Sequence, residues 1–327
     1  MKKALIFGVS GQDGSLLAKE LLNFDYEVIG VTRAAQTNFK HHTYLGISGS
    51  LRIISADINS QMIVQDLIEE VCPDEIYHLA AQSSVSESLK HPRITFDSIV
   101  PITFAILESI RLINPKIKFY HAASSECFGT NLEMVSSRMP FDPKSPYGLG
   151  KSLACNVVDY FRDHHEIFAV NGFLFNHESE FRNTNFVTAK ILHGALDISK
   201  MKEKKISLGN TKVSRDWGLA SEYVEAMRLM LQHERPDDFI ISTGFPMSLE
   251  EFAITVFQEF NLNFFDHLDA KPSEFRALDI DFSCGYSGQA FDKLGWRPEF
   301  TGKSAIRELV IRFLKYQEWK SKSELLS

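Results

Sequence analysis

Short apolar runs alternate with amphipathic segments along the first half of the chain. Each apolar run has the length of a strand and is followed by a turn and a segment of helical period, as in a parallel sheet with crossover helices. The expected strands are residues 4–7, 27–31, 51–56, 75–81 and 117–120, with another at 239–242. The pattern predicts an α/β fold, a doubly wound parallel sheet of Rossmann type whose ligands lie beyond the carboxyl ends of its strands.

The first strand leads into a glycine-rich turn and then into the amphipathic segment 15–22. Gly8, Gly11 and Gly14 have the spacing GxxGxxG. The first glycine permits a tight turn, the second lets the backbone approach a pyrophosphate, and the third lets the helix pack on the strand. The N–H groups of the helix would face the phosphates. A turn without a ligand is the alternative for the motif alone, and the βαβ spacing disfavours it.

The end of the second strand is where the ribose of a dinucleotide would be recognised. Thr32 and Arg33 stand there, in place of the Asp or Glu typical of NAD sites. A cation favours a 2′-phosphate, so we predict NADP as the cofactor, the alternative being a solvated loop charge. After the third strand come Asp57, an acid suitably placed to accept from an adenine amino group, and Ile58. Asp57 is equally suited to cap the next helix.

Two short motifs carry the candidate chemistry. Ser124, Ser125 and Glu126 follow the fifth strand, at the edge of the sheet where a nicotinamide would lie. Tyr147 and Lys151 are spaced i and i+4 in an expected helix, which puts them on one face. A nearby ammonium would lower the Tyr147 pKa, so that the pair can take a proton from a sugar hydroxyl. Each motif alone is weak, because the Tyr and Lys spacing arises by chance and Glu126 could cap a helix.

Together, the glycine turn, the serine after the fifth strand and the YxxxK pair resemble the extended short-chain dehydrogenase/reductase superfamily. Within it, Ser124-Ser125-Glu126 looks like the Thr-Ser-Glu of GDP-mannose 4,6-dehydratases. Other segments similar to that family follow in its order over nearly the whole chain: 11–14, 73–77, 80–83, 175–179, 186–190, 208–210 and 215–218.

This resemblance implies roles for the candidate residues. Ser124 and Tyr147 would hydrogen-bond the reacting hydroxyl, Lys151 would also hold the nicotinamide ribose, and Glu126 would remove the C5 proton of the sugar. The full set of candidate cofactor-binding residues is Gly8, Gly11, Gln12, Asp13, Gly14, Arg33, Asp57, Ile58, Leu79, Ala81, Tyr147 and Lys151. The candidate residues for the GDP-sugar are Ser83, Asn176, Glu178, Val187, Lys190, Gly209, Arg215 and Arg276.

Some of these residues have simpler interpretations. Lys190 could be a solvated helix charge, and Arg215 could form a local ion pair with Asp216. We expect His177 to be a packing residue, since one histidine in an apolar loop is more often that than a ligand. No spacing typical of a metal site occurs, so no metal is predicted.

The resemblance implies a lyase that converts a GDP-hexose to its 4-keto-6-deoxy derivative through internal hydride transfer. A nucleotide-sugar epimerase or 4-dehydrogenase on the same scaffold, or a non-catalytic NADP-binding regulator, is the alternative. The chain departs from the family pattern at Glu180, Phe181 and Tyr286, which points to a different hexose or heptose. It departs also at 34–37, which leaves cofactor preference and tetramer formation open.

Composition narrows the remaining possibilities. The 327 residues carry a net charge of −7, which argues against nucleic acid or an anionic membrane as partner. Four scattered cysteines and no long apolar run favour a reduced, cytoplasmic protein. We expect a nucleotide-binding lobe of residues 1–175 with a returning segment near 211–244. Residues 176–210 and 245–327 would form a smaller, mostly helical lobe for the nucleotide sugar. A homodimer or homotetramer is expected.

Overall fold

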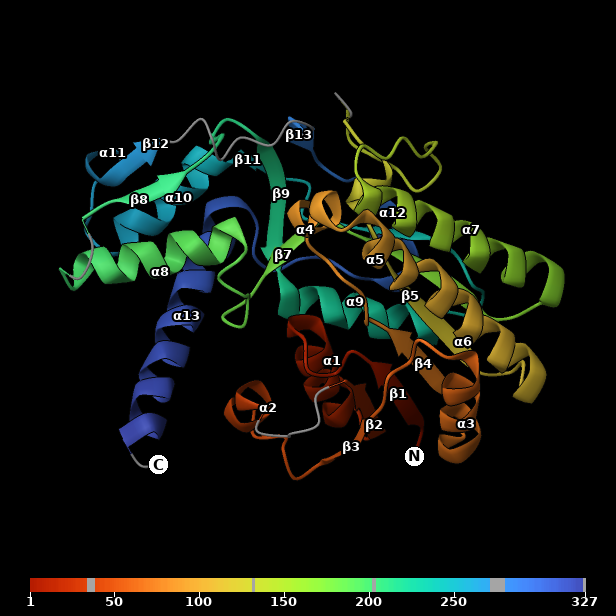
Figure 1. Cartoon of the computed structure of the whole chain (residues 1–327). Coiled ribbons are helices and arrows are strands. Elements are labelled where there is room, and N and C mark those ends of the chain that lie inside the picture. Colours follow the sequence, from red (N-terminus) through yellow and green to blue (C-terminus); the bar gives the residue numbers. More distant parts are fainter. Residues whose placement is uncertain (34–38, 131–132, 202–203, 271–279, 326–327) are drawn as a thin grey trace.

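The computed structural model describes residues 1–33, 39–130, 133–201, 204–270 and 280–325. A seven-stranded sheet with helices on both faces occupies one side of the molecule, and a smaller lobe covers the edge where its strands end (Figure 1). All neighbouring strands are parallel, in the order β10-β6-β5-β4-β1-β2-β3. They are β1 (Lys3–Phe7), β2 (Glu27–Thr32), β3 (Leu51–Ser55), β4 (Glu75–His78), β5 (Lys118–Ser124), β6 (Ala169–Leu174) and β10 (Phe239–Ile241). The predicted fold class is confirmed.

Burial on both faces explains why the strands read as continuous apolar runs. In β1, Ala4 and Ile6 belong to one core and Leu5 and Phe7 to the other, because successive side chains point to opposite faces. The first core includes helices α1 (Gln12–Asn23) and α9 (Ala220–Gln232). The second includes α3 (Gln61–Val71), α6 (Val100–Ile113) and α7 (Pro146–His165).

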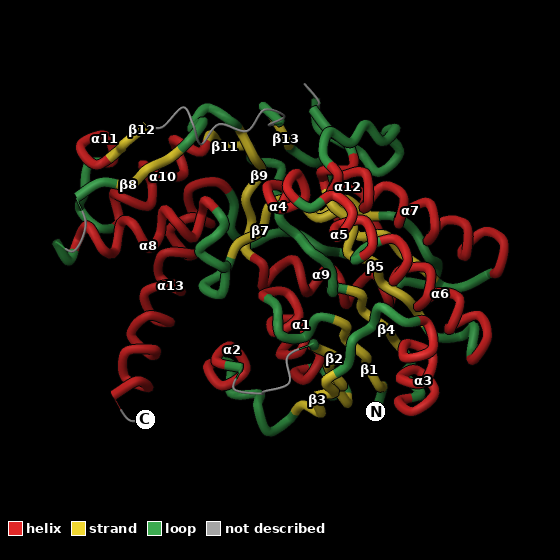
Figure 2. The backbone as a smooth tube through the Cα atoms, in the orientation of Figure 1, coloured by secondary structure: helices red, strands yellow, loops and turns green. Residues whose placement is uncertain are grey.

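The smaller lobe is built around a short sheet and its own apolar core (Figure 2). Its central strand β9 (Ser214–Leu219) pairs with β7 (Asn176–Glu178), β11 (Pro246–Ser248) and β13 (Phe282–Ser283), while β8 (Ile206–Leu208) pairs with β12 (Leu268–Ala270). The helices are α8 (Val187–Ser199), α10 (Leu249–Glu259), α11 (Phe264–His267) and α13 (Gly302–Leu325). The short elements α2 (Lys40–Tyr44), α4 (Val85–Lys90), α5 (Pro92–Asp97), α12 (Gly288–Leu294) and the 3₁₀ turn η1 (Ser125–Cys127) complete the chain.

The fourth strand is shorter than the sequence predicts. It was expected to reach residue 81, but β4 ends at His78. The reason is the glycine turn above it: a Cβ on Gly8 would lie 2.8 Å from the Ala80 nitrogen. The chain therefore leaves the sheet beneath the turn, and Leu79 and Ala81 line the cavity described below.

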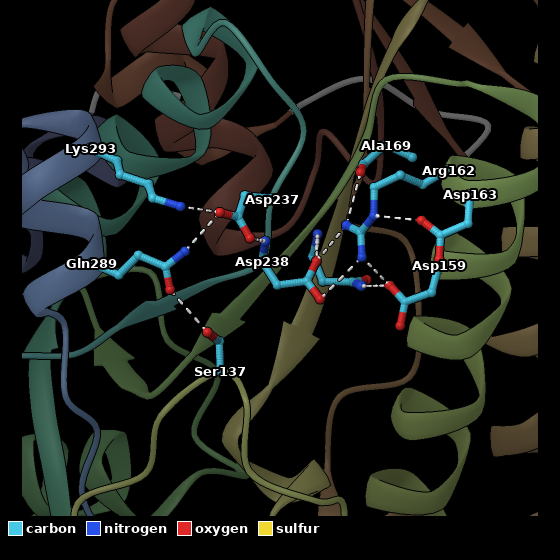
Figure 3. Close-up of polar contacts among 10 residues, drawn as sticks. Ser137, Asp159, Arg162, Asp163, Ala169, Asp237, Asp238, Gln289 and Lys293 are labelled. Carbon is cyan, nitrogen blue, oxygen red and sulfur yellow. Dashed lines mark hydrogen bonds and ion pairs between the residues drawn. The ribbon is translucent and has the colours of Figure 1, made fainter.

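A polar network holds the edge strand β10 against α7 and β6 (Figure 3). Arg162 donates to Asp238 at 2.7 Å and also to Asp159. Asn171 donates its backbone N–H to Asp238 and its side-chain amide to Asp159. Burial, and then the charge of Asp238, raise the pKa of Asp159 to about 6.

The same network continues to α12. Asp237 accepts hydrogen bonds from Gln289 at 2.9 Å and from Lys293, and Gln289 also accepts from Ser137 (Figure 3). Side chains from four separate segments thus hold β10, which is the last strand of the large sheet in chain order.

Asp159 gives the fold a pH dependence of defined sign. Its folded-state pKa of about 6 lies above the ordinary 3.8. Its contribution to stability is therefore complete below about pH 4 and is lost as the pH rises through about 6. Asp159→Asn removes this titration and keeps an acceptor oxygen. We expect the Tm of this variant, relative to that of the unchanged protein, to be higher at about pH 7.5 than at about pH 5 by scanning calorimetry.

Asp163→Asn is the matched control, because it removes a more exposed carboxylate from the same arginine. An equal pH trend in both variants would contradict the assignment to Asp159.

Candidate active site

A cavity of about 480 Å³ lies between the carboxyl ends of the parallel strands and the smaller lobe. The glycine turn, the end of β5, the first turns of α7 and the loop after β7 contribute to its walls. The candidate residues that line it are Gly8, Gly11, Gln12, Asp13, Gly14, Leu79, Ala81, Ser83, Ser124, Glu126, Tyr147, Lys151, Asn176, Glu178, Val187, Lys190, Gly209 and Arg215. Most of the residues that the sequence singled out are therefore brought together.

Three of the described candidates do not line this cavity. Arg33 is exposed at the end of β2, and Asp57 is exposed after β3. Ile58 is buried in the core beneath α3. Arg276 lies outside the described residues, as do positions 34–37. The alternative that Asp57 caps the following helix is wrong, because the residue at that N-cap is Ser60.

The glycine turn packs its backbone closely against the neighbouring segments, as a dinucleotide-binding turn requires. Gly8 adopts a φ of +93°, a conformation that favours glycine. A Cβ on Gly14 would lie only 2.2 Å from the Gly8 carbonyl oxygen. The first turn of α1 thus sits directly on the end of β1, and its N-terminus faces the cavity. These residues fit the pyrophosphate of a dinucleotide.

Ser124 and Glu126 are held by the tight turn that ends β5. The Ser124 hydroxyl accepts a hydrogen bond from the Glu126 N–H at 3.3 Å. Helix α7 packs on this turn, since a Cβ on Gly148 would lie 2.5 Å from the Glu126 carbonyl oxygen. The absence of a side chain at Gly148 therefore brings Tyr147 within hydrogen-bond reach of Ser124. The sequence analysis did not assign Gly148 a role, although it directly follows Tyr147.

The electrostatics of Tyr147 and Lys151 differ from expectation. Burial lowers the pKa of Lys151 to about 8, and its ammonium donates to the Ala122 carbonyl at 2.7 Å. It lies 6.0 Å from the centre of the Tyr147 ring. Burial raises the pKa of Tyr147, and the hydrogen bond with Ser124 only partly offsets this effect. The predicted lowering of the Tyr147 pKa is wrong for the chain's own groups, which keep this phenol protonated.

Two cations line the end of the cavity in the smaller lobe. Lys190 lies in the first turn of α8 and Arg215 lies on β9. Both are partly or fully buried cavity residues, so Lys190 is not a solvated helix charge. The alternative that Arg215 pairs with Asp216 is also wrong. The Asp216 carboxylate accepts instead from the backbone and hydroxyl of Thr243, at 2.8 and 2.7 Å, and from the next backbone N–H.

Comparison with known proteins places the chain in a family. A family model described as GDP-mannose 4,6 dehydratase matches residues 5–309. The chain belongs to the GDP-mannose 4,6-dehydratase family. A human GDP-mannose 4,6 dehydratase is 38% identical over 335 residues, covering 94% of this chain and 90% of the relative. The Vibrio cholerae GDP-mannose 4,6-dehydratase is 35% identical over 350 residues, covering 96% and 94%.

Solved structures share the fold of this family member at low sequence identity. The dTDP-glucose 4,6-dehydratase of Bacillus anthracis, in complex with NAD, has a TM-score of 0.85 at 17% identity, with 98% of each chain covered. The Thermus thermophilus UDP-glucose 4-epimerase, also in complex with NAD, has a TM-score of 0.84 at 20% identity, covering 95% of this chain and 99% of the other.

Three departures from the GDP-mannose 4,6-dehydratase pattern, at Glu180, Phe181 and Tyr286, do not lie in the cavity wall. Phe181 is buried against α2 and α13, stacked on His41 with ring centres 4.5 Å apart and packed on Tyr316 at 5.2 Å. Tyr286 is 60% exposed, and neither it, Phe181 nor Glu180 lines the cavity. The expectation that these three residues select a different sugar is therefore not supported by their positions.

Two ionisable cavity residues of this GDP-mannose 4,6-dehydratase family member were missed. His177 lies on β7 between Asn176 and Glu178, Arg182 lies in the segment after β7, and both line the cavity. Arg182 donates to the Glu178 carboxylate at 2.8 Å, and Thr188 donates to the same carboxylate oxygen. His177 was expected only to pack. The signal in the sequence that could have identified His177 and Arg182 is their position within a few residues of the candidates Asn176 and Glu178.

Proposed function

We propose that this protein is a GDP-mannose 4,6-dehydratase that converts a GDP-hexose to its 4-keto-6-deoxy derivative. The observation that carries the proposal is the position of Glu126. Glu126 lines the same cavity as Ser124, Tyr147 and Lys151. Its backbone N–H donates to the Ser124 hydroxyl, which also lies within hydrogen-bond reach of Tyr147. An oxidation or epimerisation at C4 needs no carboxylate there, whereas removal of a proton from C5 needs a base at this position.

Each residue has a chemical task in this proposal. A bound pyridine nucleotide would supply the acceptor, and later the donor, of a hydride. Ser124 holds the C4 hydroxyl of the sugar. The positive charge of a bound oxidised nicotinamide would favour the phenolate of Tyr147, and in that form the Tyr147 oxygen takes the proton of the C4 hydroxyl as the hydride leaves. Once C4 is a ketone, the C5 proton is acidic, so Glu126 can remove it and protonate the departing C6 hydroxyl. Lys151 lies close to the Tyr147 ring and would hold the nicotinamide ribose.

The diphosphate of the substrate would lie toward the smaller lobe. Lys190 and Arg215 line that end of the cavity, and a diphosphate needs cations. Arg276 is retained as a third candidate. Asn176 and Glu178 lie on β7. This strand directly follows β6 of the large sheet and pairs with β9 of the smaller lobe, so it connects the two lobes at the site.

We expect the purified protein to remove one water from GDP-mannose in the presence of substoichiometric NADP⁺, without net formation of NADPH. Mass spectrometry of the nucleotide sugar and absorbance of the cofactor measure this. Glu126→Gln should lower turnover by about 100-fold or more, the scale of one general acid–base group. In a single turnover it should still form NADPH, whereas Tyr147→Phe should form neither product.

Glu87→Gln, an exposed change on α4, serves as the control for Glu126→Gln. Full activity of Glu126→Gln, or stoichiometric NADPH from the unchanged protein, would replace the dehydratase by an epimerase or a 4-dehydrogenase. Cofactor binding without any turnover would favour the non-catalytic NADP-binding regulator.

We propose NADP, rather than NAD, as the preferred cofactor. Arg33 is exposed directly after β2, and no carboxylate occupies the end of that strand. Arg33→Ala should weaken NADP⁺ binding by about tenfold or more, because one charge–phosphate contact is lost, and leave NAD⁺ binding unchanged. Isothermal titration with both cofactors measures this. Equal losses for the two cofactors, or tighter binding of NAD⁺ by the unchanged protein, would overturn the assignment.

We propose that the chain forms a homodimer or a larger homo-oligomer. Helices α6 and α7 pack side by side at the outside of the sheet (Figure 1) and expose large apolar side chains. These are Phe104, Leu112, Leu149 and Tyr160. A cluster of this kind is typical of a subunit interface, and a second copy would bury it against itself.

Sedimentation velocity should therefore show a dimer or tetramer, and Phe104→Glu should shift it toward monomer. Ile311→Glu, at an exposed apolar position on α13, should leave the mass unchanged. A monomeric unchanged protein would contradict the proposal.

We place the protein in the cytoplasm. All four cysteines are free thiols and three are buried, as expected in a reducing compartment. Among the helices of the described residues, none has the length and apolar character needed to span a bilayer.

A further inference from the structure

His177 lies between two oxygen acceptors. Its Nδ1 is 2.7 Å from the Phe175 carbonyl oxygen, and its Nε2 is 3.0 Å from the Asp13 carboxylate. A carbonyl cannot donate a hydrogen bond, and neither can an ionised carboxylate, so both ring nitrogens must carry protons. The ring is buried and stacks on Tyr223 with centres 4.7 Å apart, which fixes its orientation. The geometry therefore makes His177 an imidazolium.

The charges around the ring agree with this protonation state. Burial alone would raise the pKa of Asp13, but the charge and hydrogen bond of His177 outweigh it and lower that pKa to about 2. Burial alone would lower the pKa of His177, but Asp13 outweighs burial and raises it, with Arg182 opposing. Arg182 is paired with Glu178. The buried set thus holds two cations and two anions, and a neutral His177 would leave it with excess negative charge.

The nearby phenols add no charge. Tyr223 stacks on His177, Tyr147 lies close enough to Arg182 and Asp13 to interact with both, and Tyr120 interacts with Asp13. Burial raises the pKa of all three hydroxyls, so they remain neutral. The charge of Asp13 is therefore balanced by His177, with Arg182 as the second cation in reach.

Asp13 belongs to the turn that faces the phosphates. It lies in the first turn of α1, one residue before Gly14. Its neighbour Gln12 donates to the His177 carbonyl at 3.2 Å and accepts from Ser179 at 2.9 Å. The glycine turn is thus joined by three hydrogen bonds to β7 and the residue that follows it. A free carboxylate at this place would repel a pyrophosphate, whereas a carboxylate paired with an imidazolium would not.

We propose that His177 is a positively charged positioning residue that neutralises Asp13 in the phosphate-facing turn and fastens this turn to β7, the strand of Asn176 and Glu178. This inference rests on the proposed binding of a pyridine dinucleotide. It means that the strand proposed to contact the sugar nucleotide also sets the affinity of the site for the cofactor. A residue that only packed would act through its shape, whereas His177 acts through its charge.

The test is a double-mutant cycle on cofactor affinity. His177→Gln leaves Asp13 without its cation and should weaken NADP⁺ binding by about tenfold or more, the scale of one close charge interaction. Asp13→Asn supplies the second background of the cycle, because an amide oxygen can still accept from the ring but carries no charge to be neutralised. On that background, His177→Gln should cost much less than tenfold in affinity. The double variant should recover most of the affinity that His177→Gln loses. If it binds as weakly as His177→Gln alone, the neutralising role is overturned.

His42→Gln is a matched control. His42 is also buried and also hydrogen-bonds the glycine turn, through the Val9 carbonyl at 3.0 Å, but within the described part of the chain no carboxylate interacts with its ring. Asp13→Asn should not rescue any loss of cofactor affinity in His42→Gln. Rescue of both histidine variants by Asp13→Asn would mean that removal of the carboxylate strengthens binding on its own, which would overturn the specific pairing.

The protonation state itself can be measured without cofactor. Nitrogen NMR of the histidine side chains should show both nitrogens of His177 protonated at about pH 7.5, above the ordinary histidine pKa of about 6.5. Asp13→Asn should return this ring to the neutral form. A neutral His177 in the unchanged protein would overturn the inference even if the cofactor binds. Failure of the unchanged protein to bind NADP⁺ or NAD⁺ would instead refute the proposed function.

Discussion

The site depends on one close backbone contact, the one between the glycine turn and the segment after β4. Gly8 leaves no room for a side chain against Leu79 and Ala80, and Gly14 leaves none against Gly8. Since these atoms are in contact, α1 must begin where β1 ends, and the chain after β4 must leave the sheet. Both consequences open the space beyond the strands that becomes the cavity. A similar close contact occurs at Gly148, where the missing side chain lets α7 pack against the turn that contains Glu126.

Desolvation then sets the chemistry of the walls. It disfavours both charged forms of the central pair, lowering the pKa of Lys151 and raising that of Tyr147. Two of the charged pairs in the walls are Arg182 with Glu178 and His177 with Asp13. These pairs hold the segments that carry them in place.

The sequence predicted the parts of this structure that follow from local pattern. The apolar runs predicted six of the seven strands of the large sheet, but not β6. The proline before Tyr147 marked the start of α7. Both signals are carried by neighbouring residues. What it could not predict depends on contacts between distant segments. The early end of β4 follows from Gly8, some 70 positions away. The charge of His177 follows from Asp13, and the burial of Phe181 depends on α2 and α13.

Departures from a family pattern are a related case. Phe181 and Tyr286 differ from the usual residues, and their proximity to substrate motifs in the sequence suggested altered specificity. In the fold, Phe181 packs an aromatic cluster at the C-terminal helix and Tyr286 faces solvent. Neither residue lines the cavity that Glu126, Tyr147 and Lys151 share.

The return of β10 to the large sheet has a consequence for how such proteins diversify. The chain enters the smaller lobe at β7, comes back through α9 and β10, and leaves again at β11. Neither lobe is one continuous stretch of sequence. A single crossover between two related genes therefore cannot exchange the substrate side intact. New specificity on this scaffold has to arise by point substitution within the walls, or by several coordinated exchanges at once.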